Sequence, residues 1–347
     1  MKLFLAAAAL ALLICFSPML LSKKVDTEIM FAAYSWKTTY YYSSVQDSLL
    51  EKNNFKRMYV KIMDIDWSPV YNAYPTTSND ITYELESHPN FEFVPVVFIT
   101  NETMRYADSA AVKVLSQKLI LKSKQLCRNL DGIKEVQIDC DWSKSTKDKY
   151  FYLLTLLKDS LQNKTLSATI RLHQYKHKDL CGVPPIDKGM LMLYNMGRIS
   201  DYNETNSIFN YNEALKYING AGVYPLPLDA ALPCFNWGII FRKKQFYDIA
   251  HTVSREYLDT CKSFVKLPNG NYKVIANYWD NDYSSYMSYG DELRLEEIAS
   301  EDLIKASKLV NKIKNQDTMY VSFFELNSST LTTLDSLTYE KIRTTIK

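Results

Sequence analysis

Short runs of apolar, β-branched or aromatic residues recur along the chain, and polar or helix-like segments separate them. The runs predict strands at residues 28–36, 57–67, 91–100, 135–142, 166–174, 189–195, 224–231 and 319–326. Amphipathic stretches predict helices at residues 39–53, 107–129, 147–161 and 301–314. Near-continuous apolar strands that alternate with helices are typical of a parallel sheet covered on both faces. Eight such units predict an α/β fold, a (β/α)8 TIM-type barrel.

The seventh strand and the segment after it depart from this regular alternation. Pro225, Pro227 and Pro233 are awkward inside a central strand because proline donates no hydrogen bond to the ladder, so we expect this strand to be short or irregular. Residues 234–298 are then an insertion before the eighth strand. Within it, residues 264–275 read as a hairpin that turns at Asn269-Gly270. We expect one elaborated domain over residues 25–347, with a small β subdomain beside the barrel mouth.

The first 24 residues are predicted to lie outside this domain. Residues 3–22 carry no charge, and they follow Lys2 and precede Lys23-Lys24, which is typical of an export signal. The stretch is also long enough to span a bilayer as a helix. Three fates stay open: signal cleavage, lipidation at Cys15, or an uncleaved anchor. We expect an exported bacterial protein, periplasmic or at the cell surface, with membrane contact only through this segment.

Composition and small motifs narrow the chemistry. The formal net charge is +2 and the sequence has no basic stripe, which disfavours nucleic acid as a partner. The cysteines after Cys15 are widely spaced, without the CxxC or Cys/His grouping of a structural zinc site. His173 and His177 are close in sequence, but we interpret them as part of a polar loop after a strand. Phosphate-binding glycine motifs are missing, so we expect no cofactor.

Pairs of aspartates stand at the ends of two predicted strands. Asp64 and Asp66 close the second strand, and Asp139 and Asp141 close the fourth. Because alternate residues of a strand share a face, each pair is expected to point together into the barrel, with Ser143 next in line. Two carboxylates at this spacing repel, which raises the pKa of one and makes it a proton carrier. Function in such barrels sits at these strand ends.

Two short segments resemble a known family. Residues 136–143 (VQIDCDWS) resemble the DGxDxDxE motif of family 18 glycoside hydrolases, the chitinase-like barrels, and residues 192–195 (MLYN) resemble that family's MxYD motif. The resemblance places Asp139 on the inner aspartate, Asp141 beside the catalytic acid, and Tyr194 on the tyrosine that contacts the substrate acetamide. Asn195 replaces an acidic residue. Ser143 stands where the family has its acid, and a hydroxyl cannot protonate a leaving oxygen as a carboxylic acid does.

A second resemblance covers most of the mature chain but implies no activity. Residues 223–235 (VYPLPLDAALPCF) and 289–296 (YGDELRLE) are similar to segments of an uncharacterised bacterial family of exported barrels. The function therefore has to be argued from the strand-end residues themselves. The oligomeric state and the identity of the sugar or linkage do not follow from the sequence.

Three functions remain open. The first is a glycoside hydrolase with a displaced acid, in which the proton comes from Asp66, Asp229 at the end of the seventh strand, or Glu325 at the end of the eighth. The second is a non-catalytic barrel that binds carbohydrate, with aromatic faces at strand ends stacking on sugar rings. These aromatic residues are Trp36, Trp67, Trp142 and Trp237. The third is a hydrolase in which the strand-end aspartates hold Mg²⁺ or Ca²⁺.

Overall fold

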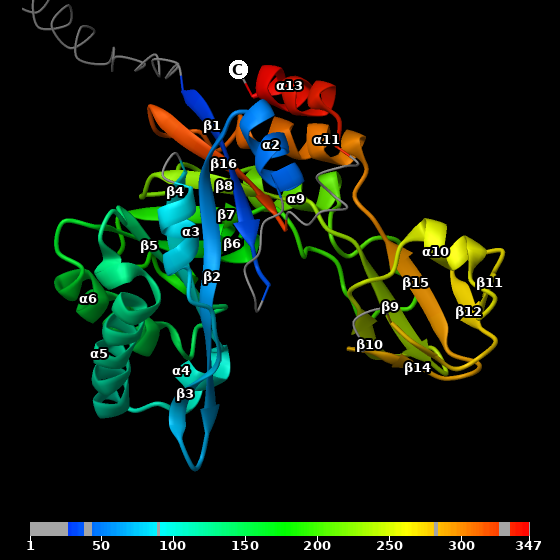
Figure 1. Ribbon diagram of the computed structural model, residues 1–347, viewed down its shortest axis with the longest axis horizontal. Helices are drawn as coiled ribbons and strands as arrows, with labels where there is room; N and C mark the ends of the chain where they lie inside the picture. Colours follow the sequence, from blue (N-terminus) through cyan, green and yellow to red (C-terminus); the bar gives the residue numbers. More distant parts are fainter. Residues whose placement is uncertain (1–26, 38–43, 89–90, 281–283, 326–333, 347) are drawn as a thin grey trace, which may run out of the picture.

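Parallel strands close into a barrel at the centre of the molecule. The computed structural model describes residues 27–37, 44–88, 91–280, 284–325 and 334–346. The barrel strands are β1 (Glu28–Ser35), β2 (Phe55–Ser68), β4 (Glu92–Ile99), β5 (Glu135–Asp139), β6 (Thr165–Arg171), β7 (Lys188–Met192), β8 (Leu228–Pro233) and β16 (Thr318–Phe324). Each pairs in parallel with the next, and β1 pairs with both β2 and β16, which closes the ring (Figure 1). The predicted α/β, TIM-type barrel is confirmed.

Helices cover the outside of the barrel. They are α2 (Ser44–Lys52), α3 (Thr82–Ser87), α4 (Asn101–Tyr106), α5 (Ser109–Leu126), the 3-10 helix η1 (Arg128–Leu130), α6 (Lys147–Ser160), α7 (Leu172–Lys176), α8 (Lys178–Cys181), α9 (Tyr211–Ile218), α11 (Ser300–Val310) and α13 (Ser336–Thr345). Aromatic side chains join the two layers: the Tyr339 ring of α13 lies 5.3 Å from that of Phe323 and 5.6 Å from that of Phe55, centre to centre. This outer core accounts for the near-continuous apolar character of the strands.

Two expectations about helices need correction. The helix predicted over residues 107–129 is shorter, because the Asp108 side chain caps its first turn by accepting from the Ala111 amide at 2.7 Å, and Cys127 leaves helical geometry with φ of −134°. His173 lies in α7 and His177 directly follows it, so the predicted loop after the fifth barrel strand is instead a short helix.

Strand β2 is longer than a barrel requires. It continues past the barrel and turns back as β3 (Asn72–Ser78), which pairs with it in antiparallel fashion and projects from the barrel in Figure 1. The sequence pattern did not reveal β3, because this edge strand is polar, largely exposed and contains Pro75. An edge strand tolerates proline since one side of its backbone has no ladder to supply.

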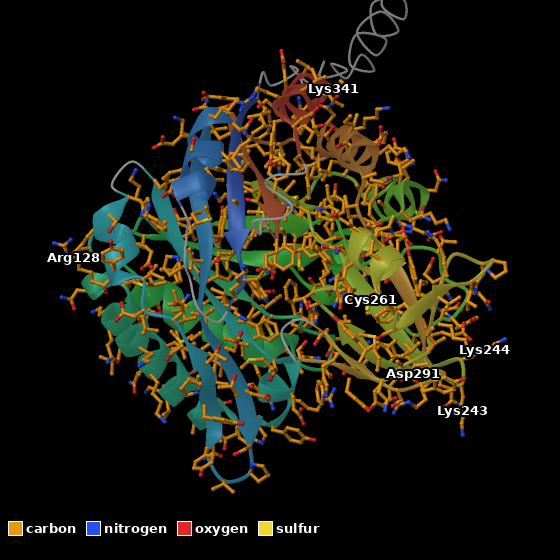
Figure 2. The ribbon with its side chains drawn as sticks, turned by 45° about the vertical axis from the view of Figure 1, so that its right-hand side comes forward. Arg128, Lys243, Lys244, Cys261, Asp291 and Lys341 are labelled. Atoms are coloured by element: carbon orange, nitrogen blue, oxygen red, sulfur yellow. The ribbon has the colours of Figure 1, made fainter. Side chains whose placement is uncertain are left out.

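The insertion between β8 and β16 folds as a β-rich subdomain. Its elements are β9 (Trp237–Arg242), β10 (Gln245–Ala250), α10 (Arg255–Thr260), β11 (Phe264–Lys266), β12 (Tyr272–Val274), β13 (Tyr278–Trp279), β14 (Tyr286–Met287) and β15 (Glu292–Glu296). The predicted hairpin is confirmed as β11 and β12, and Gly270 in its turn has φ of +89°. Figure 2 shows the subdomain, marked by Cys261 and Asp291, on the side of the molecule away from Arg128.

The seventh barrel strand begins after two of its prolines. β8 starts at Leu228, so Pro225 and Pro227 precede it and Pro233 is its last residue. The strand is short, as expected. Asp229 is therefore the second residue of the strand and not its end, which corrects its predicted place at the barrel mouth.

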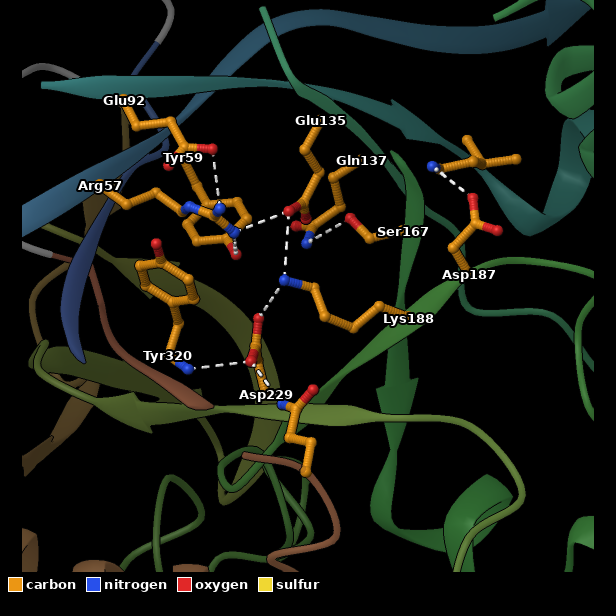
Figure 3. Close-up of polar contacts among 12 residues, drawn as sticks. Arg57, Tyr59, Glu92, Glu135, Gln137, Ser167, Asp187, Lys188, Asp229 and Tyr320 are labelled. Atoms are coloured by element: carbon orange, nitrogen blue, oxygen red, sulfur yellow. Dashed lines mark hydrogen bonds and ion pairs between the residues drawn. The ribbon is translucent and has the colours of Figure 1, made fainter. Parts of the chain in front are cut away.

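Charged side chains fill the amino-terminal half of the barrel (Figure 3). The Arg57 guanidinium lies 2.6 Å from a carboxylate oxygen of Glu135 and 2.8 Å from one of Glu92. The Lys188 ammonium lies 2.7 Å from Asp229 and 3.2 Å from Glu135. Because these residues begin their strands, the network sits at the end of the barrel opposite to the carboxyl-terminal strand ends.

The predicted leader at residues 1–24 lies outside the described residues, as do positions 39–43 of the first predicted helix. Within the part of the chain that the structure describes, no helix is long and apolar enough to cross a bilayer.

Candidate functional site

One wall of the barrel mouth is polar and comes from β5 and β6. Asp139, the last residue of β5, is buried and accepts a hydrogen bond from the Thr169 hydroxyl of β6 at 2.5 Å. Two residues further on, Asp141 is half-exposed and lies 2.7 Å from the Arg171 guanidinium at the end of β6. The two aspartates thus occupy neighbouring levels of the mouth, as their spacing predicted.

The two carboxyl groups differ in their environment. Burial, aided by the nearby Asp141 carboxylate, raises the pKa of Asp139 to about 7, although the hydrogen bond from Thr169 acts in the opposite direction. Asp139 is therefore able to hold a proton near neutral pH. Asp141, in contrast, faces solvent and is paired with the Arg171 guanidinium. The pKa of one carboxyl of the pair is raised, as expected, but burial contributes more to this shift than the repulsion from Asp141.

A second acidic pair lies on β2. Asp64 is 3.0 Å from the Lys61 ammonium and also accepts a hydrogen bond from the Thr77 hydroxyl of β3. Asp66 accepts from the Thr100 hydroxyl at 2.9 Å. Lys61 is buried and its ammonium lies 5.1 Å from the centre of the Trp36 ring, which places this end of β2 at the mouth.

The opposite wall is aromatic. Tyr194, two residues after β7, is stacked on Phe324 with ring centres 4.8 Å apart, and Phe235 meets both rings edge-on. Trp36, just after β1, lies 5.5 Å from Phe324. Burial raises the pKa of the Tyr194 phenol, and the nearby carboxyl groups of the mouth raise it further. The hydroxyl of Tyr194 therefore stays protonated and is available as a donor.

Glu325 follows β16 at the edge of this aromatic wall. Its Oε1 accepts from the Trp36 amide at 3.2 Å, and the side chain is half-buried. Burial raises the pKa of this carboxyl above its usual range, although the Trp36 hydrogen bond and nearby lysines lower it. In the ring of barrel strands, β16 and β5 are four places apart out of eight, so Glu325 and Asp141 stand on opposite sides of the mouth.

The structure separates the four predicted sugar-stacking tryptophans. Trp142 is 1% exposed, donates its indole N–H to the Cys181 carbonyl at 3.2 Å and stacks on Tyr150, so its face is part of the core and the expectation that it meets sugar is corrected. Trp67 stacks on Tyr106 of α4, on the opposite face of β2 from Asp66. Trp237 lies behind Phe235 and donates its indole N–H to Glu296. Only Trp36 of the four borders the mouth directly.

The other predicted site residues fall in different places. Asp229 is fully buried in the charge network, away from the mouth. Asn195 is exposed beside Tyr194 and has φ of +55°, a left-handed conformation that asparagine tolerates. Ser143, in the position of the family acid, shares hydrogen bonds with the hydroxyls of Ser145 and Thr146. Within the described residues, no group of three or more His, Cys, Asp or Glu side chains is arranged to hold a metal ion.

Sequence reasoning missed three polar partners in the mouth. Lys61, Thr169 and Arg171 each contact one of the predicted aspartates. The signal for Thr169 and Arg171 was present, because they alternate on β6 as Asp139 and Asp141 do on the neighbouring strand end. Lys61 is three residues from Asp64, and this spacing gives no such signal.

Comparison with known proteins identifies solved structures that have a similar fold. No protein-family model matches the chain, and no curated protein matches it. Among solved structures, the spore cortex-lytic enzyme SleL from Bacillus cereus is similar with a TM-score of 0.54 and 13% identity, over 93% of this chain and 75% of that one. A chitinase from Chromobacterium violaceum gives 0.54 and 11%, over 91% and 98% of the two chains. Catalytic domain 2 of the group II chitinase from Ostrinia furnacalis, in complex with penta-N-acetylchitooctaose (NAG)5, gives 0.51 and 11%, over 92% and 95%. The chain thus has a glycoside-hydrolase-like barrel, the fold of these chitinases.

Proposed function

We propose that the mouth of this barrel binds carbohydrate and cleaves a glycosidic bond by carboxylate acid–base chemistry. The observation that carries the proposal is the composition of the mouth: carboxyl groups follow β5 and β16, on opposite sides of the ring of strands, and Trp36, Tyr194 and Phe324 form an aromatic surface beside them. Aromatic faces pack against the apolar faces of sugar rings, and carboxylates bind their hydroxyls. The complex of a chitinase of the same fold with (NAG)5 supports a sugar as the ligand.

Glu325 is the candidate acid in this proposal. Burial raises its pKa above the usual range, which favours the protonated form that a general acid needs, and it stands opposite Asp141 in the ring of strands. Glu325 gives its proton to the glycosidic oxygen as the bond from that oxygen to the anomeric carbon breaks. The Asp141 carboxylate stabilises the positive charge that develops on the sugar ring. Water then adds to the anomeric carbon and returns a proton to Glu325.

Ser143 favours a second candidate, binding without turnover. The position that carries the family acid holds a hydroxyl engaged with Ser145 and Thr146. A barrel that keeps the aromatic wall and loses the acid retains a sugar but does not cleave it. The two candidates share the ligand class and differ in whether Glu325 transfers a proton.

The test compares the full-length protein with Asp141→Asn and Glu325→Gln, and uses Glu340→Gln on the exposed face of α13 as the matched control. Each is incubated with N-acetylated and neutral oligosaccharides, and new reducing ends and retained ligand are scored in parallel. Turnover by the parent and the control, with a loss of about 10²-fold or more in Glu325→Gln, supports the hydrolase. Retention by all four proteins without cleavage supports the binding barrel. If the proteins show neither turnover nor retention, both candidate functions are refuted.

A further inference from the structure

A hollow opens beside Asp141, at the residues that follow β6 and β7. It has a volume of about 210 Å³ at the ends of β6 and β7, and its lining includes Arg171, His173, Tyr194, Asn195 and Tyr217. Tyr194 also belongs to the aromatic wall of the mouth, so the hollow adjoins the proposed sugar site. Its volume is large enough for a substituent of a sugar ring held in the mouth.

The polar groups of this hollow are mostly unpaired donors. Arg171 gives Nη1 to Asp141, and within the described chain its other guanidinium N–H groups have no hydrogen-bond partner. The same part of the structure offers no partner to the imidazole of His173 or to the side-chain amide of Asn195. The main-chain N–H of Asn195 donates to the Ile208 carbonyl at 2.8 Å, which fixes the backbone that carries this amide.

The charges near the hollow favour a ligand group that accepts hydrogen bonds. One oxygen of Asp141 is already engaged by Arg171 at 2.7 Å. A second cation lies near Tyr217: the Lys176 ammonium is 5.8 Å from the centre of that ring and donates to the Lys216 carbonyl. Burial and the Arg171 charge lower the pKa of His173, so its imidazole is neutral at pH 7 and can donate one N–H without adding charge.

We propose that this hollow is a subsite for a carboxylate carried by the sugar, held by the free edge of Arg171 and by donors from His173 and Asn195. A guanidinium edge matches the two oxygens of a carboxylate, which makes the contact stronger than one to a neutral hydroxyl or ester. The inference rests on the proposed carbohydrate function, because the carboxylate reaches the hollow as part of a ligand bound at the mouth. It narrows the substrate class to acidic sugars.

The test measures the affinity of full-length protein for three probes at pH 7 by calorimetry. They are N-acetylated chitotriose, the same trisaccharide with one C6 hydroxymethyl oxidised to a carboxylate, and the methyl ester of that acid. The acid is expected to bind about tenfold more tightly than the ester. Arg171→Gln is expected to bring the ratio close to one, Arg171→Lys to retain part of it, and His173→Gln to reduce it about threefold. Arg128→Gln, on the exposed surface, serves as the control and keeps the full ratio.

The outcomes separate this inference from the function on which it rests. Equal binding of all three probes, or weaker binding of the acid, overturns the carboxylate subsite and leaves the carbohydrate site intact. A preference for the acid that survives in Arg171→Gln also overturns it, because the guanidinium is then not the partner. Failure to bind any of the probes overturns the subsite as proposed here, and the panel of N-acetylated and neutral oligosaccharides then decides separately whether the carbohydrate function stands.

Discussion

Substitution of Lys188 by methionine tests how much the ion pairs in the amino-terminal half of the barrel contribute to the stability of the fold. The Lys188 ammonium is the cation nearest to Asp229, at 2.7 Å, and both carboxylates that it contacts are 2% exposed or less. Glu135 keeps Arg57 at 2.6 Å in the variant, so the loss falls on Asp229. Breaking one partner of a buried pair costs about 3–5 kcal/mol.

Protonation of Asp229 sets a separate upper limit on the free energy of unfolding that Lys188→Met can lose. Once Lys188 is removed, Asp229 can take up a proton, and for a carboxyl with an unfolded-state pKa of about 3.9 this costs about 4 kcal/mol at pH 7 and about 1.5 kcal/mol at pH 5. Burial already raises the pKa of Asp229 in the parent, against the effect of Lys188, so the removal of the cation raises it further. The deficit of Lys188→Met relative to the parent is therefore expected to shrink as the pH falls from 7 to 5.

Urea unfolding of full-length protein at the two pH values measures this difference. Lys158→Met is the matched control, because its ammonium lies 2.8 Å from Asp187 with both side chains about 40% exposed, and we expect it to cost less than about 1 kcal/mol at either pH. Adding Asp229→Asn to Lys188→Met is expected to restore most of the loss at pH 7. The reasoning is refuted if Lys188→Met costs no more than Lys158→Met, or if its deficit is the same at both pH values.

Three further outcomes are expected. Because burial raises the folded-state pKa of Asp139 to about 7, the free energy of unfolding of the parent is expected to fall relative to that of Asp139→Asn as the pH rises from about 4 to 7. Urea titrations in which the difference between the two proteins stays constant over this range contradict the shift. Trp142→Ala is expected to lower the free energy of unfolding in urea by about 3–5 kcal/mol, since the ring is buried. Trp36→Ala is expected to weaken sugar retention with a smaller loss of stability. If Trp142→Ala weakens retention and Trp36→Ala does not, the assignment of the sugar to Trp36 is wrong. Carbohydrate retention is expected to be unchanged by chelator, and a chelator-sensitive activity would favour the metal-dependent hydrolase.

The barrel itself could be predicted from the sequence because its signal is local. Each strand is a short apolar run bounded by polar residues, and the same apolar faces that mark the runs form the layer between barrel and helices. The positions of Asp139 and Asp141 also followed, since period-two alternation fixes which residues share a face.

The errors arise where local patterns do not determine the register. The pairing of β2 with β4 shifts between Lys61 and Met63, and this irregularity puts Lys61 and Asp64 at one end of the mouth although they are three residues apart. Asp229 was misplaced for a similar reason: a four-residue error in where β8 begins moves its side chain from one end of the barrel to the other. The Trp142 ring packs on Tyr150, and its indole N–H reaches the carbonyl of Cys181, 39 residues away. The sequence around Trp142 gives no signal for this long-range contact.

The two halves of the barrel interior together decide where chemistry can occur. Ion pairs of Arg57 and Lys188 fill the amino-terminal half, so the carboxylates there are neutralised and buried. At the mouth, in contrast, Glu325 is half-buried and Asp141 half-exposed, and the aromatic wall extends from β1 past β16 and β8 to β7. Ser143 after the fourth barrel strand therefore does not rule out the proposed acid–base chemistry, because Glu325 brings a carboxyl with a raised pKa to the opposite side of the mouth. Under the proposed carbohydrate function, Glu325 is the residue that distinguishes hydrolysis from binding alone.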